Sequence, residues 1–451
     1  AKAFCLSAEI ARKYKGKIIL RWDDTNPEAE KEEFVHAIRD GIKWLGLHWD
    51  SETYCSDHMQ EMYKLCEKLI MQGDAYGCTC TQEEIGKARE EKKRCPCGSK
   101  SPEENLEFWR KMLKDMPEGE GTIRLKGDMA SENTVMRDPA LFRIIASPHY
   151  RQGNKYRVWP TYDFQGAVMD SFLGITHPLR SKEYELRDEL YEYLLKRLGL
   201  RVPKMLTISR LSLKNAPVSK RLLRPLVESG ELLGWDDPRL PTLMGLKRRG
   251  ILPEAIRAFV LSFGLSKVES EPGWEILLSE NRKLLDPVAE HYFFVPNPVK
   301  LVVKGAPEKE ACLKTHPKKE EFRKYKTKGI FYIPSVDLKE LKTGDIFRLK
   351  DLYNVKIAKK GRAEILGEYA GEEMLSCKKL QWVSDEHLEC ECWKIGDLLK
   401  DEKFSPSSLI KEKGLAEKAV EKLEEGETVQ FERYGFCRLD SKNPLVFIHS
   451  C

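Results

Sequence analysis

Apolar residues along the first fifty positions switch between helical and strand spacing. Residues 1–14 place Phe4, Ala8 and Ala11 on one side and predict a helix. The next apolar run, at 17–22, is short and bounded by charged residues, which predicts a buried strand.

A polar stretch at 23–27 follows that strand. Asn26 is a favoured N-cap and Pro27 a favoured first helical residue, so we expect a second helix to begin here. Its apolar positions keep helical spacing at Phe34, Ile38, Ile42 and Leu45. Strand, polar loop and helix in this order are typical of α/β folds, in which ligands bind at the carboxyl ends of strands.

Residues 71–150 break this rhythm with polar and charged sequence, which indicates an insertion. The α/β pattern returns at 156–169 and 174–180. An amphipathic helix follows, with leucines spaced by four at Leu186, Leu190, Leu194 and Leu198.

The chain changes character at about residue 216 and again after Pro296. Residues 216–290 predict short helices joined by loops that contain Pro and Gly. Residues 305–328 are rich in Lys and Glu, and we expect a loop or an extended linker there. Short β-like runs predict a β-barrel or a pair of barrels, at 299–303, 329–333, 346–349, 355–358, 380–383, 428–431 and 445–448.

Composition narrows the class of protein. The 451 residues are 41% hydrophobic and 33% charged, a globular profile with no apolar run of membrane-spanning length. The 77 basic and 72 acidic residues give a net charge of +5, too small by itself to indicate a nucleic-acid partner. Thirteen cysteines without a secretory signal favour a reducing, cytoplasmic setting with thiols or metal sites.

Four of the cysteines form two close pairs, Cys78 with Cys80 and Cys95 with Cys97, separated by fourteen residues. Two C-x-C pairs suit a tetrahedral structural zinc, and the charged loop between them does not suit buried free thiols. A second group has only three members, which favours packing inside a β-barrel over a metal site: Cys377, Cys390 and Cys392.

Three polar residues carry candidate chemistry, each with a simpler reading beside it. Asp23, after the first strand, can hold an ammonium group or merely shape a capping loop. Arg180, at a strand–helix junction, is either a fork for a carboxylate or a surface charge. Lys220, in Val218-Ser219-Lys220-Arg221, can stabilise phosphate charge or be an ordinary surface lysine. Taken alone, the aromatic residues around Tyr162 are better explained by core packing.

Together these stretches resemble one family in order and spacing. The matching segments are LRWDDTNPE, VWPTYDFQGAVMDSFLGITHPLRSKEYELRDELY, ISRLSLKNAPVSKR, GWDDPRLPTLMGLKRRGILPEAIRAF, NRKLLDP and GETVQFERYGFCRLD. The chain resembles class I glutamyl-tRNA synthetases of the archaeal and eukaryotic type, which are themselves similar to glutaminyl-tRNA synthetases. The resemblance covers nearly all of the chain.

The resemblance implies an α/β multidomain fold. We expect the first half of a Rossmann-type catalytic domain at 1–70, an acceptor-stem-binding insertion with the zinc site at 71–150, and the second Rossmann half at 151–215. A helical stem-contact region at 216–295 and β-barrel anticodon-binding domains at 296–451 would complete the chain.

The implied reaction has two steps: ATP with Mg²⁺ activates L-glutamate as an adenylate, and the glutamyl group passes to tRNA-Glu. Whether tRNA-Gln is also charged stays open, as does the oligomeric state. No covalent nucleophile is needed, so catalysis is positioning and charge stabilisation. The resemblance implies that Asp23, Tyr162 and Arg180 bind glutamate. It implies that ATP is bound by Arg210, Leu211, Ser219 and Lys220, of which Lys220 would be catalytic.

Arg180 separates glutamate from glutamine. A second substrate carboxylate is costly to desolvate unpaired, and a guanidinium fork matches it. In glutaminyl enzymes the corresponding position is typically not Arg. Two alternatives remain: a glutaminyl-tRNA ligase, and a non-catalytic tRNA-binding paralogue.

Two further expectations concern catalysis and anticodon binding. The family's HIGH motif belongs immediately before Ala1, so we expect these 451 residues alone to bind tRNA without catalysing glutamate-dependent pyrophosphate exchange. In the C-terminal domains unpaired bases would stack on side chains. The candidates, each equally readable as core, are Trp382, Phe431, Arg433 and Tyr434.

Overall fold

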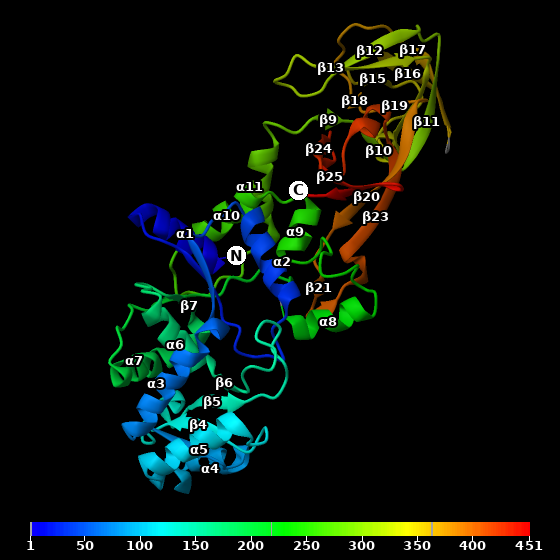
Figure 1. The fold of residues 1–451 in the computed structure, drawn as a ribbon. Coiled ribbons are helices and arrows are strands. Elements are labelled where there is room, and N and C mark those ends of the chain that lie inside the picture. The colour runs from blue at the N-terminus through cyan, green and yellow to red at the C-terminus, as the bar shows by residue number, and fades with distance from the viewer. Residues whose placement is uncertain (1, 218, 362–363) are drawn as a thin grey trace. The chain divides into compact units, whose positions relative to one another are not determined.

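The computed structural model describes residues 2–217, 219–361 and 364–451 (Figure 1). The chain divides into two compact units. Unit 1 comprises residues 1–211 with 263–270, and unit 2 comprises residues 212–262 with 271–451. Ala1 and Val218, which belong to the predicted first helix and to the candidate phosphate loop, lie outside the described residues.

Unit 1 opens with the predicted helix, strand and helix. They are α1 (Lys2–Tyr14), β1 (Ile19–Trp22) and α2 (Glu32–Trp44), followed by β2 (Ser51–Tyr54) and α3 (Met59–Met71). Strands β1 and β2 pair in parallel, with Ile19 opposite Ser51. Parallel pairing across a helix is the α/β arrangement expected from the sequence.

The predicted start of the second helix is wrong. Asn26 caps only one turn: its backbone carbonyl accepts from the N–H groups of Ala29 and Glu30, at 3.0 and 3.1 Å. The helix begins at Glu32, six positions later. Asn and Asp favour isolated turns as readily as helix caps, and the sequence alone did not separate the two.

A four-stranded antiparallel sheet occupies the middle of unit 1, in the order β3-β4-β5-β6. Its strands and the helices of this segment are β3 (Ala75–Cys78), α4 (Gln82–Glu90), α5 (Pro102–Lys114), β4 (Thr122–Leu125), β5 (Ala140–Ile144) and β6 (Val158–Pro160). Buried aromatic and aliphatic residues join this sheet to α3, α5, α6 and α7 in one core, among them Trp109, Phe142, Phe164 and Leu194.

The rest of unit 1 follows the α/β pattern again. Its elements are α6 (Tyr162–Phe172), β7 (Leu179–Ser181), α7 (Asp188–Leu198) and β8 (Leu206–Ile208). Strands β7 and β8 pair in parallel, with Arg180 opposite Thr207. The leucine spacing correctly predicted α7, although Leu186 lies in a 3₁₀ turn before it and is 65% exposed.

Unit 2 contains the short helices expected after residue 216. They are α8 (Lys220–Glu228), α9 (Leu243–Arg249), α10 (Pro253–Ser262) and α11 (Trp274–Leu285). Helices α10 and α11 pack against each other. In the described part of the chain no helix is long and apolar enough to cross a membrane.

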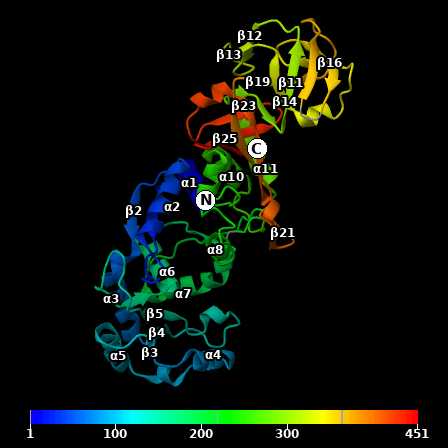
Figure 2. The ribbon, with the colours of Figure 1, turned by 90° about the vertical axis from the view of Figure 1, so that its right-hand side faces the viewer.

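The remainder of unit 2 is built on two seven-stranded sheets with separate cores, which confirms the predicted β-rich domains (Figures 1 and 2). One sheet has the order β10-β23-β20-β26-β25-β24-β9, with β9 (His291–Tyr292), β10 (Phe294–Pro296), β20 (His387–Ile395), β23 (Leu409–Glu417), β24 (Thr428–Phe431), β25 (Gly435–Lys442) and β26 (Leu445–His449). The other has the order β18-β15-β16-β17-β11-β14-β19, with β11 (Pro298–Lys304), β14 (Ile330–Pro334), β15 (Ile346–Leu349), β16 (Asn354–Lys360), β17 (Glu364–Tyr369), β18 (Lys379–Leu380) and β19 (Val383–Ser384).

The expected linker at 305–328 is instead a β-hairpin. Strands β12 (Lys309–Lys314) and β13 (Phe322–Thr327) pair antiparallel. Ala311 and Leu313 are buried on one face while charged side chains occupy the other. The many Lys and Glu residues give this segment the composition of a polar linker, although its buried positions alternate as in a strand. A second short hairpin joins β21 (Leu399–Lys400) and β22 (Lys403–Phe404).

Candidate functional site

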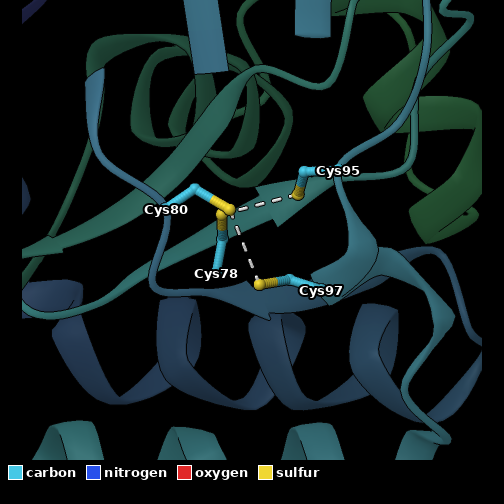
Figure 3. Close-up of side chains that lie close together, drawn as sticks. All are labelled: Cys78, Cys80, Cys95 and Cys97. Carbon is cyan, nitrogen blue, oxygen red and sulfur yellow. Dashed lines mark hydrogen bonds between the residues drawn. The ribbon is translucent and has the colours of Figure 1, made fainter. Parts of the chain in front are cut away.

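The four cysteines of the two C-x-C pairs come together in unit 1 (Figure 3). Cys78 ends the buried strand β3, and Cys80 lies just before α4, whose N-terminus carries a capping box between Thr81 and Glu84. Cys95 and Cys97 flank Pro96 at the start of a 3₁₀ turn. A strand end and a tight turn therefore present the two pairs to each other.

The sulfur positions fit a tetrahedral zinc. All four Sγ atoms lie within 4.8 Å of one another, and the Cys78–Cys95 and Cys80–Cys97 distances are 3.7 and 3.8 Å. Zn–S bonds of about 2.3 Å place sulfurs about 3.8 Å apart at the corners of a tetrahedron. Four thiolates leave no open coordination position, so a zinc bound here would be structural rather than catalytic.

Polar neighbours support the thiol cluster from the side of Cys95. The Tyr76 hydroxyl lies 3.6 Å from Cys95 Sγ and donates to Asp138 at 2.9 Å. Arg94 donates to the same carboxylate at 2.7 Å. Burial raises the pKa of the Cys80 thiol to about 11, so metal binding must displace protons from thiols.

A second constellation surrounds Arg180. Its guanidinium donates to Asp170 Oδ2 at 2.9 Å and lies over the rings of Tyr162 and Tyr191, at 5.2 and 4.9 Å from the centroids. The Tyr191 hydroxyl donates to the same Asp170 oxygen at 3.1 Å. Burial raises the pKa of Tyr191, and the Asp170 charge raises it further. Arg180 is therefore a held, nearly buried cation rather than a surface charge, with 10% of its side chain exposed.

Asp23 belongs to the same network through Arg21. Arg21 Nε donates to Asp23 Oδ1 at 2.6 Å, and its Nη1 donates to Asp170. Burial would raise the pKa of Asp23, but attraction to Arg21 outweighs it and lowers the pKa. Asp23 is thus charged at neutral pH and a third exposed, as an ammonium-binding carboxylate requires, although it already has one cationic partner.

The neighbouring Asp24 behaves differently. It is 2% exposed and accepts from the Ser56 N–H and hydroxyl at 2.9 and 2.8 Å. Burial nevertheless raises its pKa to about 6. The His149 ring, buried against Trp159, lies 3.0 Å from the Asp24 backbone carbonyl, and burial lowers the pKa of His149. These contacts hold the loop after β1 in place beside Asp23.

The remaining candidate residues are distributed over both units. Arg210 and Leu211 follow β8 in unit 1; Arg210 is exposed and paired with Glu183 at 3.2 Å, and Leu211 is half-buried. Ser219 precedes α8 of unit 2 and Lys220 is its first residue, both exposed. Their roles at ATP stay predictions.

Sequence reasoning missed Arg21, Asp170 and Tyr191. Arg21 reads as a flanking charge of a strand, and Tyr191 as a helix-face aromatic. Asp170 carried the one visible signal, since it is an acid directly after the apolar residues 166–169 and eight residues after Tyr162. A charge among apolar helix positions needs a buried partner.

The aromatic candidates of the C-terminal region fall mostly into cores. Trp382 is 2% exposed and Phe431 is fully buried, so neither can stack on a base. Arg433 forms a two-bond ion pair with Asp337, at 2.8 and 2.9 Å. Cys390 and Cys392 pack in the core of one sheet, as expected of structural thiols.

Comparison with known proteins gives a match along most of the chain. Residues 1–287 match the family model of the class I tRNA synthetase (E and Q) catalytic domain, and residues 289–370 and 379–440 match two models of the anticodon-binding domain of the same group.

Individual relatives match along the whole chain. A glutamate–tRNA ligase of Nitrosopumilus maritimus is 42% identical over 454 residues, and the match covers 100% of this chain and 79% of that protein. One from Pyrococcus furiosus is 40% identical over 452 residues, covering 98% and 77%. The crystal structure of a glutamate tRNA ligase from Elizabethkingia meningosepticum, with its amino acid, is 18% identical, covers 64% of this chain and 66% of that one, and has a TM-score of 0.46.

Proposed function

The chain belongs to the class I tRNA synthetases of the glutamyl and glutaminyl group, and we propose that it is a glutamate–tRNA ligase in which Asp23 and Arg180 recognise the amino acid. The full-length relatives at 42% and 40% identity support the choice of glutamate. The observation that carries the assignment of residues is the held guanidinium of Arg180. It hydrogen-bonds to Asp170 through one nitrogen, Nη2.

The charges suit glutamate at both ends. The substrate ammonium pairs with the Asp23 carboxylate, and the side-chain carboxylate pairs with Arg180, beside Tyr162. A glutamine side chain ends in a neutral amide, so the Arg180 donors that Asp170 leaves unpaired would lose a charge-assisted bond to a carboxylate at a site that is little exposed.

The reaction then needs only alignment and charge. The α-carboxylate of glutamate attacks the α-phosphate of ATP, whose Mg²⁺-bound pyrophosphate leaves. A terminal ribose hydroxyl of the tRNA then attacks the adenylate carbonyl, AMP leaves, and the hydroxyl proton goes to solvent. We assign ATP binding to Arg210, Leu211, Ser219 and Lys220, with Lys220 stabilising charge on the phosphates.

The other parts of the chain serve the RNA. We assign the binding of tRNA-Glu to the insertion and the anticodon-binding domains. Whether tRNA-Gln is a second substrate stays open. Zn²⁺ at Cys78, Cys80, Cys95 and Cys97 would order the segment between them. We place the protein in the cytoplasm, a compartment in which these thiols stay reduced.

The test is amino-acid-dependent ATP–pyrophosphate exchange and tRNA charging, with tRNA-Glu present, in a protein that carries the HIGH segment. Glutamate should support both reactions and glutamine neither. Exchange with glutamine but not glutamate would make the chain a glutaminyl enzyme. RNA binding without exchange for either amino acid would make it a non-catalytic relative.

A further inference from the structure

Helix α6 presents three positions, spaced by four residues, along the side that faces Arg180. Tyr162 places its ring 5.2 Å from the guanidinium carbon, and Asp170 accepts from Nη2 at 2.9 Å. Gly166 lies between them, four residues from each. Residues at this spacing share a helix face, so the glycine lies directly beneath the guanidinium.

The absence of a side chain at Gly166 makes room for Arg180. A Cβ built on Gly166 would lie 3.1 Å from Arg180 Nη2, and its next neighbours would be 3.9 Å away, in Arg180 and Tyr162. The backbone does not explain the glycine, because the positive-φ glycines of the chain do not include it. Glycine inside a helix is less stable than alanine. The close approach of the guanidinium is therefore the feature that accounts for it.

Apart from Gly166, Arg180 is positioned by its bond to Asp170 and by the rings of Tyr162 and Tyr191. Asp170 is its one hydrogen-bond acceptor in the described part of the chain, so Nε and Nη1 have no protein acceptor there. Asp188 interacts with Arg180 electrostatically but does not hydrogen-bond to it. Nη2 is anchored on Asp170, and the N–H groups of Nε and Nη1 remain for a ligand. Because the guanidinium is rigid, a shift of Nη2 would move these donors as well.

We propose that Gly166 is a specificity-determining position that acts through Arg180: it sets how deeply the guanidinium lies against α6, and so where its free donors meet a substrate carboxylate. The inference rests on the proposed function, since it assumes that Arg180 contacts glutamate. Gly166 itself contacts no substrate and is a positioning residue.

The experiment is a double-mutant cycle of Gly166→Ala and Arg180→Lys, in a protein that carries the HIGH segment, with glutamate-dependent exchange as the assay. Gly166→Ala should raise the KM for glutamate about 3- to 10-fold, as expected for a displacement of a few tenths of an ångström, with kcat and the KM for ATP unchanged. Exchange with glutamine should stay at background in every variant. Lysine has no Nη2, so in the Arg180→Lys background the alanine should add less than 2-fold.

Gly86→Ala is the matched control. It is the same substitution in the interior of a helix, α4, and its Cβ would meet nothing within 4 Å. It should leave every kinetic constant unchanged. No variant should unfold at a lower temperature than the parent, which separates displacement of Arg180 from loss of the fold.

The outcomes separate the two hypotheses. If the parent protein shows no glutamate-dependent exchange, the proposed function fails. If the parent is active and Gly166→Ala has the parent's KM for glutamate, or if its effect is the same in both backgrounds, the role of Gly166 is overturned while the function stands.

Discussion

Replacing one thiol of the Cys cluster should loosen a whole segment of unit 1. The fourteen residues between Cys80 and Cys95 include helix α4, which buries no side chain. A short helix with no fully buried side chain depends on the contacts around it, here the turn after Cys80 and the bond that Arg137 donates to the Arg89 carbonyl at 3.0 Å, so the cluster is one of its supports. Cys80→Ser is a milder perturbation than Cys78→Ser, because Cys80 is only partly buried whereas Cys78 is 1% exposed.

The magnitude follows from the ligand count. Structural zinc sites contribute about 10–16 kcal/mol of apparent binding free energy, so one of four thiolates accounts for about 3–4 kcal/mol. Zinc affinity should fall by about 10²–10³-fold. Because thiols with raised pKa values must lose protons to bind the metal, the affinity of the parent should also fall as the pH decreases.

The assay is competition for zinc with a chromophoric chelator, with metal content measured by mass spectrometry. Limited trypsin digestion reports on the segment itself, since Lys92 and Lys93 are exposed after α4 and should be cut faster in the variant. Cys312→Ser, which replaces an exposed cysteine of the β12–β13 hairpin, is the control and should change neither readout. Parent protein prepared without chelator that holds no zinc, or a Cys80→Ser protein that holds it equally tightly, would refute the reasoning.

Three further predictions concern single side chains. In a protein that carries the HIGH segment, Arg180→Cys should raise the KM for glutamate by about 100-fold, as one charge-assisted contact of about 3 kcal/mol is lost; unchanged glutamate kinetics would remove Arg180 from the site. Lys220→Ala should slow adenylate formation about 10²–10³-fold in single-turnover assays with glutamate binding nearly unchanged, while Arg221→Ala, its exposed neighbour, should have little effect. Burial raises the pKa of Glu30 to about 7, so the folded state favours the protonated carboxyl. The stability of the folded state therefore decreases as the pH rises from about 4.5 through 7, where this carboxyl loses its proton. Glu30→Gln should therefore gain stability relative to the parent by about 1–2 kcal/mol between pH 5 and 8, allowing for partial exposure, and thermal midpoints that differ equally at both pH values would contradict this.

Helices and strands were predicted correctly where the spacing of apolar residues was regular. The leucines of α7 repeat at helical spacing and three of them are buried, so the periodicity and the packing agree. Strands β20 and β23 are the longest pair in unit 2, yet they escaped prediction. Residues His387–Ile395 of β20 alternate apolar side chains with Glu and Lys. The apolar side chains are buried only once β20 pairs with β23 and β26, which come later in the chain.

The candidate site divides in the same way. The thiol cluster was readable because its four ligands lie in two local pairs joined by a short loop. The network around Arg180 was only half readable, because its members are far apart: Arg21 and Asp170 are separated by 149 positions. Pairing across such distances is decided by the fold, so a sequence shows the charges without showing which ones neutralise each other.

Charge balance shows why these partners matter for recognition. Arg21 and Arg180 are the two cations of the network, and Asp23 and Asp170 its two anions, so the four groups together are neutral. The adjacent Asp24 adds little charge to this balance in mildly acid solution, because burial raises its pKa to about 6. A neutral network attracts neither end of an amino acid by net charge. We therefore propose that it binds one by geometry, with the Asp23 carboxylate meeting the ammonium and the Arg180 donors that Asp170 leaves unpaired meeting the carboxylate. On this proposal, recognition of glutamate depends on how each guanidinium is shared between its protein anion and the substrate, and that sharing is set by the positions of Asp170 and Gly166 on one helix.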